Sequence, residues 1–153
     1  MISRIFSSCL LLTAICVAAN GQTSKPRPAA SPVIELQLIR ATPAYAELLL
    51  HKTELTSTLE SLLADYNEAY PKVRELRSEL TLLNAEIARL MAVKPTDAGR
   101  LTLALGRMML RKVELETELE TLRAQYKDEH PDVRKLKRKI EVFESAIKEI
   151  LGQ

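Results

Sequence analysis

The chain has 153 residues, 46% of them hydrophobic and 27% charged, which is the composition of one small globular domain. Four glycines, two phenylalanines and no tryptophan argue against a β-sandwich or a cofactor pocket. The formal net charge of +2 is too balanced for a nucleic-acid-binding protein, whose basic stripe usually dominates its domain. We therefore expect no nucleic-acid partner and no cofactor.

The N-terminal segment 1–21 is typical of a secretory signal peptide. Arg4 supplies the positive charge, and the run 5–19 that follows is almost entirely apolar. This run is shorter than the roughly 20 residues that a membrane-spanning helix needs. We therefore expect cleavage near Ala19 or Gly21, and a mature protein that is periplasmic or secreted.

Residues 22–41 are predicted to form a flexible or extended leader. Three of the seven prolines fall in 22–32, together with serine and alanine. Ile34, Leu36 and Leu38 alternate with polar residues in the stretch that follows. The alternation is compatible with an extended tail on a helix surface, which we favour, or with a strand added to a partner.

From Thr42 onward, apolar residues recur at spacings of three and four, which predicts α-helices. Thr42 and Pro43 suit the N-cap and the first helical position, and Pro71 and Pro131 suit the start of two later helices. The stretch 94–97 is expected to close the second helix and cap the third. The four apolar seams are Tyr45, Leu48, Leu55, Leu59, Leu62 and Tyr66; Val73, Leu76, Leu80, Leu83, Ile87 and Leu90; Leu101, Leu105, Met108, Leu115, Leu119, Leu122 and Tyr126; and Val133, Leu136, Ile140, Phe143, Ile147 and Ile150. Their period of about 3.5 residues predicts coiled-coil packing of four helices that alternate up and down.

The helical region is an internal repeat. A shift of sixty residues aligns 44–93 with 104–153, and fifteen of the fifty aligned positions are identical. The fold predicted from this pattern is all-α, with two repeated antiparallel helical hairpins over 42–93 and 94–153.

Positions on and beside the seams predict further contacts. Lys52 and Lys112 interrupt the seams at equivalent places and are expected to reach nearby glutamates, which would specify the pairing. The apolar residues that widen the stripe are Leu49, Leu63, Leu82, Met109, Leu110, Val113 and Val142. The hairpins are therefore expected to pack together or to form a homo-oligomer.

The second turn region reads Leu119-x2-Leu122-x3-Tyr126-x3-His130-Pro131-x-Val133-x2-Leu136. It resembles the periplasmic coiled-coil hairpin of bacterial chain-length determinant proteins, the polysaccharide co-polymerases. The first turn region matches the same pattern, with Tyr70 in place of the histidine. The resemblance implies a structural segment that projects from the membrane and mediates assembly. Because the chain lacks a second membrane segment and a P-loop, we expect only an exported version of this module.

The hairpin turns supply one group of candidate site residues, namely Tyr66, Tyr70, Pro71, Tyr126, His130 and Pro131. Tyr66 and Tyr126 are expected to plug the hairpin ends, and His130 to cap or line its turn.

The mature chain offers no starting point for catalysis. Both cysteines, Cys9 and Cys16, lie inside the predicted signal peptide. Neither His51 nor His130 has a second histidine or a cysteine at metal spacing, and Asp128 and Glu129 near His130 are ordinary helix-end acids. No Ser/His/Asp grouping or phosphate loop occurs. We predict that the protein is not an enzyme and holds no metal.

The strongest charge feature is a basic patch made of Lys127, Arg134, Lys135, Lys137, Arg138 and Lys139. It could bind an acidic polysaccharide or a membrane surface. The alternative, which we favour, is that three of these cations pair with acids across the second hairpin. The expected pairs set Glu116, Glu118 and Glu120 opposite Lys137, Arg138 and Lys139.

Taken together, these patterns predict an exported, non-enzymatic helical-hairpin protein that acts through protein–protein contact in the cell envelope, with a link to polysaccharide export. The alternative is an ATP-independent periplasmic chaperone for unfolded envelope proteins. A sealed apolar stripe would favour the first function, and an exposed apolar groove would favour the second.

Overall fold

A computed structural model describes residues 32–153, which are helical and contain no strand. The all-α prediction is therefore confirmed for this part of the chain. The predicted signal peptide and the prolines before Pro32 lie outside the described residues. In chain order the elements are α1 (Pro32–Arg40), α2 (Pro43–Asp65), α3 (Pro71–Met91), the 3-10 helix η1 (Pro95–Arg100), α4 (Leu103–Arg123) and α5 (Pro131–Leu151).

The long helices begin where the local chemistry favours a start. Pro43, Pro71 and Pro131 each occupy the first turn, where the missing amide hydrogen costs no intrahelical bond. The Thr42 hydroxyl accepts a hydrogen bond from the amide of Tyr45 at 3.4 Å and so caps α2. These starts are those that the sequence predicts.

The start of α4 differs from the prediction. Pro95 opens the short helix η1, and α4 begins only at Leu103, so that 94–97 does not cap it. Thr102 is the N-cap, because its hydroxyl is free to accept from the amide of Leu105 at 3.3 Å. Leu101, expected within the helix, instead lies in the connection and is buried.

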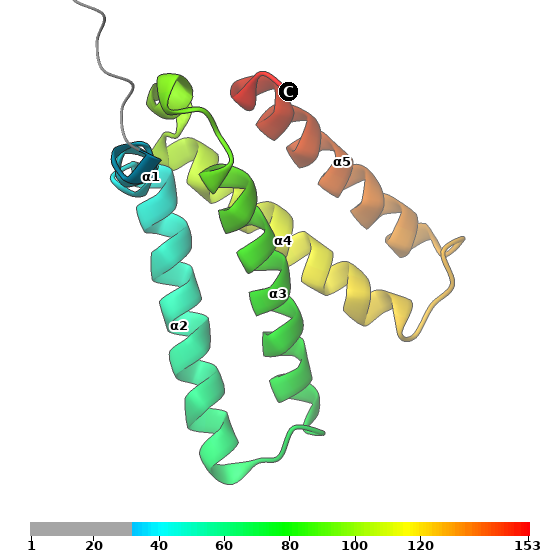
Figure 1. Ribbon diagram of the computed structural model, residues 1–153. Coiled ribbons are helices and arrows are strands. Elements are labelled where there is room, and N and C mark those ends of the chain that lie inside the picture. Colours follow the sequence, from blue (N-terminus) through cyan, green and yellow to red (C-terminus); the bar gives the residue numbers. More distant parts are fainter. Residues whose placement is uncertain (1–31) are drawn as a thin grey trace, which may run out of the picture.

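The helices α2 and α3 run antiparallel and are joined by the turn at 66–70 (Figure 1). Helix α4 contacts both of them, while α5 runs back along α4. Towards its C-terminal end α5 contacts η1, and Glu144 of α5 accepts a hydrogen bond from Arg89 of the first hairpin. The arrangement is thus a three-helix core of α2, α3 and α4, with α5 along its flank.

Two clusters of buried apolar side chains hold this arrangement together. The larger one joins α1, α2, α3 and α4 with the end of α5 and includes Ile39, Ala44, Leu48, Leu55, Leu59, Val73, Leu76, Leu83, Leu90, Leu101, Leu105, Met109, Val113, Ile147 and Leu151. The smaller one lies between α4 and α5 and consists of Leu115, Leu119, Val133 and Leu136, with Leu122, Ile140 and Phe143 packed against it. The outer part of the second hairpin therefore has a core of its own.

The predicted extended leader is wrong for residues 32–40, which form α1. This short helix packs against η1, α2 and α3, and within residues 34–40 Ile39 is the one fully buried side chain, in the larger core. The Thr42 hydroxyl also donates to the carbonyl of Ile39 at 2.7 Å. A nine-residue helix is marginal alone, so these tertiary contacts decide its conformation over the weak alternating pattern.

Candidate interaction surfaces

The two hairpin turns have the same local geometry. Tyr66 stacks on Tyr70 with ring centroids 4.2 Å apart, and Tyr126 stacks on His130 at the same distance. The amides of Tyr66 and Tyr126 each donate to a leucine carbonyl at the end of the preceding helix at 2.8 Å. The Nδ1 atom of His130 accepts from the amide of Asp132 at 3.3 Å, a cap that Tyr70 does not provide.

The tyrosines do not plug the hairpin ends as predicted. Tyr66 is 47% exposed and Tyr126 is 43% exposed, each stacked on its turn partner at the surface. The apolar positions that close the ends are Val73 and Val133, which are fully buried. Pro71 and Pro131, the remaining turn residues, are exposed at the helix starts.

A largely buried charge network joins α3, α4 and α5. The Nζ atom of Lys112 lies 2.6 Å from Glu86, 3.3 Å from Glu116 and 3.2 Å from Glu144. Arg89 donates to Glu144 at 3.0 Å. Glu86 is only 5% exposed, and its second carboxylate oxygen has no hydrogen-bond partner. Three carboxylates are thus compensated by Lys112 and Arg89, with the more exposed Lys148 also 3.3 Å from Glu144.

The pKa values in the network follow from this arrangement. Burial lowers the pKa of Lys112, but its three carboxylate neighbours outweigh burial and raise it above 10.5. Burial raises the pKa of Glu116 above 4.5, and Lys112 only partly opposes that rise. Burial also acts to raise the pKa of Glu144, but hydrogen bonds from Arg89 and Lys112 bring it below 4.5.

The two seam lysines have different surroundings. Lys112 reaches glutamates, whereas Lys52 is half-buried and forms no ion pair with the described residues. The repeat explains the contrast, because the positions equivalent to Glu86, Glu116 and Glu144 are Ala146, Thr56 and Asn84. Sequence reasoning did not identify Glu86 as part of this network. Its spacing from Leu83 and Leu90 places it on the buried face and could have revealed it.

The predicted pairing of the basic patch across the second hairpin is wrong. Lys137 bonds to Asp128 at 2.9 Å, and Lys135 bonds to Asp132 at 3.4 Å, both within or next to the turn. The expected acids are engaged elsewhere or free, since Glu116 contacts Lys112 and Glu120 accepts from Ser78. Within residues 34–153, the cations without an ion pair in this patch are Lys127, Arg134, Arg138 and Lys139. Local turn acids therefore compete successfully for the cations nearest to them.

Asp128 is the anchor of the second turn. Hydrogen bonds from Arg123 and Lys137 hold the pKa of this exposed carboxyl at about 2, well below its ordinary 3.8. The first turn has a comparable clamp, in which Arg77 donates to Glu68. Each turn is thus closed by an arginine and an acid.

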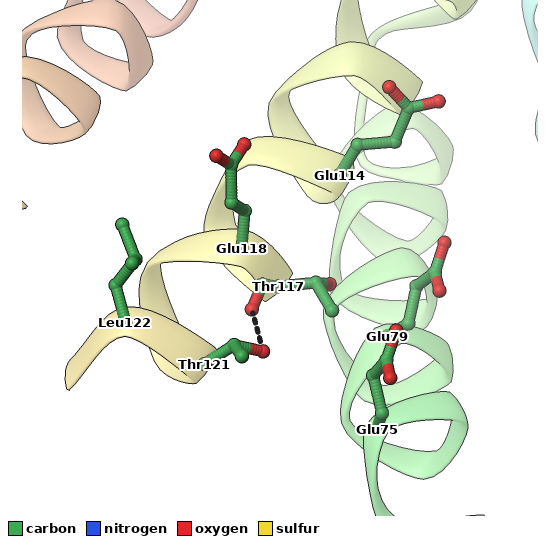
Figure 2. Close-up of a pocket in the computed structure, with 7 residues that line it drawn as sticks. All are labelled: Glu75, Glu79, Glu114, Thr117, Glu118, Thr121 and Leu122. Carbon is green, nitrogen blue, oxygen red and sulfur yellow. Dashed lines mark hydrogen bonds between the residues drawn. The ribbon is translucent and has the colours of Figure 1, made fainter. Parts of the chain in front are cut away.

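An acidic hollow between α3 and α4 was not predicted from the sequence. Figure 2 shows Glu75 and Glu79 reaching into it from α3, and Glu114 and Glu118 from α4. Two of these acids have a cationic neighbour, since Glu75 bonds to Lys72 and Glu114 to Arg111, while Glu79 lies within hydrogen-bond distance of the His51 ring. Half of the acids in the hollow are therefore paired with a cation of their own helix.

Among the described residues, no three or more His, Cys, Asp or Glu side chains are placed so that they could hold a metal ion. In the same part of the chain, none of the helices is both long and apolar enough to cross a membrane. No family model, curated protein or solved structure matches the chain.

Proposed function

We propose that the protein is an exported, non-enzymatic assembly module of the cell envelope, built from two repeated helical hairpins and acting through protein–protein contact. The observation that carries this proposal is that five of the seven apolar residues beside the helix seams are buried or half-buried, while Leu49 and Val142 are exposed. Met109 and Val113 are fully buried, and Leu63, Leu82 and Leu110 pack half-buried against the core. The five covered side chains hold the scaffold together and are not available to bind unfolded clients.

The export step and the link to polysaccharide export belong to the same proposal. Export is supported by the charge and apolar run of residues 1–21. The link to polysaccharide export is supported by the resemblance of the turn regions to the hairpin of the co-polymerases. The free cations Arg134 and Lys139 offer a second type of contact, with an acidic polysaccharide or a membrane surface.

A periplasmic chaperone is the second candidate, and the exposed side chains of α1 favour it. Ile34, Leu36 and Leu38 are each between 44% and 51% exposed. Leu36 and Ile39 line a hollow with Met91 and Val93 at the same end of the molecule. This apolar surface is small, whereas a chaperone groove must cover extended client segments.

Cross-linking in intact cells tests the proposal. Photo-reactive residues placed at Tyr126 and at Lys139 would sample the second turn and the basic patch, both exposed. A third one at Leu36 would sample α1, and non-irradiated cells serve as the control. Joined proteins are identified by mass spectrometry, and the N-terminus of the recovered chain shows whether and where it is cleaved.

A few stoichiometric envelope proteins joined at Tyr126 or Lys139 would support the assembly role. Many unrelated unfolded proteins joined at Leu36 would overturn it in favour of the chaperone. An intact N-terminus on protein recovered from the cytoplasm would overturn the export step.

A further inference from the structure

The contact between the two hairpins has a defined register. Helix α4 lies on the first hairpin through a docking face made of Met109, Lys112, Val113, Glu116, Thr117 and Glu120. On α3, Ser78 and Glu86 lie opposite this face, and Leu82 and Arg89 continue the same side of the helix at spacings of three and four. Lys112 pairs with Glu86, and Glu120 accepts a hydrogen bond from Ser78. These two antiparallel contacts fix how one hairpin sits on the other.

The repeat places an equivalent docking face on α2. Moving the six docking residues back by sixty positions yields Leu49, Lys52, Thr53, Thr56, Ser57 and Glu60. These same six residues line a hollow on the outer side of α2. Leu49 is 44% exposed, whereas its counterpart Met109 is fully buried. The α2 face is therefore a docking face without an occupant in the described chain.

The repeat also places an equivalent receiving groove on α5. The counterparts of Ser78, Leu82, Glu86 and Arg89 are Arg138, Val142, Ala146 and Glu149. All four line a second hollow, on α5. Val142 is 68% exposed, whereas its counterpart Leu82 is half-buried against the core. Both halves of the internal contact thus have exposed copies, on different helices.

The α2 face and the α5 groove carry complementary charges when they are aligned in the same way as α4 on α3. Glu60 is the counterpart of Glu120, and Arg138 is the counterpart of Ser78, so that an acid would meet a base. Lys52 would lie opposite Ala146, one helical turn from Glu149. Neither Glu60 nor Arg138 forms an ion pair within residues 34–153.

We propose that the α2 face of one copy docks into the α5 groove of a second copy, repeating between molecules the contact that joins the hairpins within one. This inference rests on the proposed assembly role, to which it adds a partner of known chemistry. Because the two surfaces differ and lie on separate helices, the contact is head-to-tail. Such contacts generate rings or open chains instead of a closed two-fold dimer.

A charge exchange between two variants tests the contact. Sedimentation velocity on the full chain, as the cell processes it, measures association across a wide concentration range at low salt. Glu60→Arg and Arg138→Glu each place like charges opposite one another, and each is expected to weaken association about tenfold or more. An equimolar mixture of the two variants recreates both opposite-charge contacts and is expected to restore association. Glu129→Arg and Lys127→Glu, exposed turn residues with the same charge changes, are the controls.

Association of the unaltered protein, its loss in both variants and its return in the mixture would support the proposal. A protein that stays monomeric at every concentration, or a mixture no more associated than its components, would overturn it. Thermal melts followed by circular dichroism check that the variants remain folded. The proposed assembly role is tested separately by the cross-linking in cells. If the purified chain is monomeric but envelope proteins are cross-linked to it, only the self-docking is refuted.

Discussion

Lys52 and Lys112 occupy the same position of the repeat and meet different surroundings. Lys112 is 12% exposed and holds three carboxylates together, one of which is itself almost fully buried. Lys52 lies on an open face with no ion pair among the described residues. A side chain that is structural in one hairpin is therefore available for intermolecular contact in the other.

Replacing Lys112 by methionine is expected to destabilise the fold by about 3 kcal/mol, because the three carboxylates would be left with Arg89 and the more exposed Lys148. The matched substitution Lys52→Met should change the free energy of unfolding by less than about 0.5 kcal/mol. Urea unfolding followed by circular dichroism measures both. Equal losses in the two variants would contradict the structural role assigned to the network.

The charged groups of the network affect the stability of the fold in different pH ranges. The raised pKa of Lys112 means that its contribution is fully present below pH 10.5 and is lost as the pH rises through its higher folded-state value. The lowered pKa of Glu144 means that its contribution is present above pH 4.5 and is lost as the pH falls below. Glu116, with a raised pKa, opposes Glu144, since its protonation on acidification relieves the cost of burying its charge. Lys112→Met should therefore remove part of the loss of stability on the alkaline side.

Helix α4 lies close to α2 at Gly106. A Cβ atom at this position would lie 3.0 Å from the Cα of Ala44, 3.1 Å from its carbonyl oxygen and 3.2 Å from the Cβ of Glu47. Two of these three atoms belong to the backbone and cannot rotate away. The absence of a side chain at Gly106 thus sets the distance between the two hairpins.

Gly106→Ala is expected to destabilise the protein by about 1–2 kcal/mol, because overpacking exceeds the gain of up to about 1 kcal/mol in helix propensity. Gly99→Ala is the control, since nothing lies within 4 Å of the added methyl group. Thermal unfolding of the two variants against the unaltered protein tests the difference. A Gly106→Ala variant as stable as the original would show that the helices can separate without cost.

At this same scale, the sequence predicts the long helices well and the short ones poorly. Prolines and apolar spacing locate α2, α3 and α5, since those signals are local. The helix α1 and the late start of α4 were missed because tertiary contacts of Ile39 and Leu101 decide them. The Lys137–Asp128 pair was missed for a different reason, because surface cations pair with whichever acid is nearest once the turn has formed.

The whole molecule is held together unevenly. Helices α2, α3 and α4 contact one another. In contrast, α5 packs mainly against α4, and its first half shares a separate small core with that helix. Segments with few buried contacts open locally at a lower free-energy cost than segments with many. The helix α5 is thus the element that should detach first.

Native-state hydrogen exchange is expected to show lower protection for the amides of α5 than for those of α3. Leu136→Ala removes a side chain that is 4% exposed in the small core and should lower the opening free energy of α5 by about 2–3 kcal/mol. Protection in α3 should change little if α5 opens alone. A uniform loss of protection in all helices would instead indicate a single cooperative unit.

The stacked rings at the two turns also determine which part of this protein its intrinsic fluorescence reports on. The chain contains no tryptophan, and three of its four tyrosines, Tyr66, Tyr70 and Tyr126, are exposed in the turns. Its intrinsic ultraviolet emission therefore originates mainly at the hairpin tips, away from the core and from the buried lysine. Tyrosine emission would change when a molecule binds at the hairpin tips, and it would change little when the interior repacks.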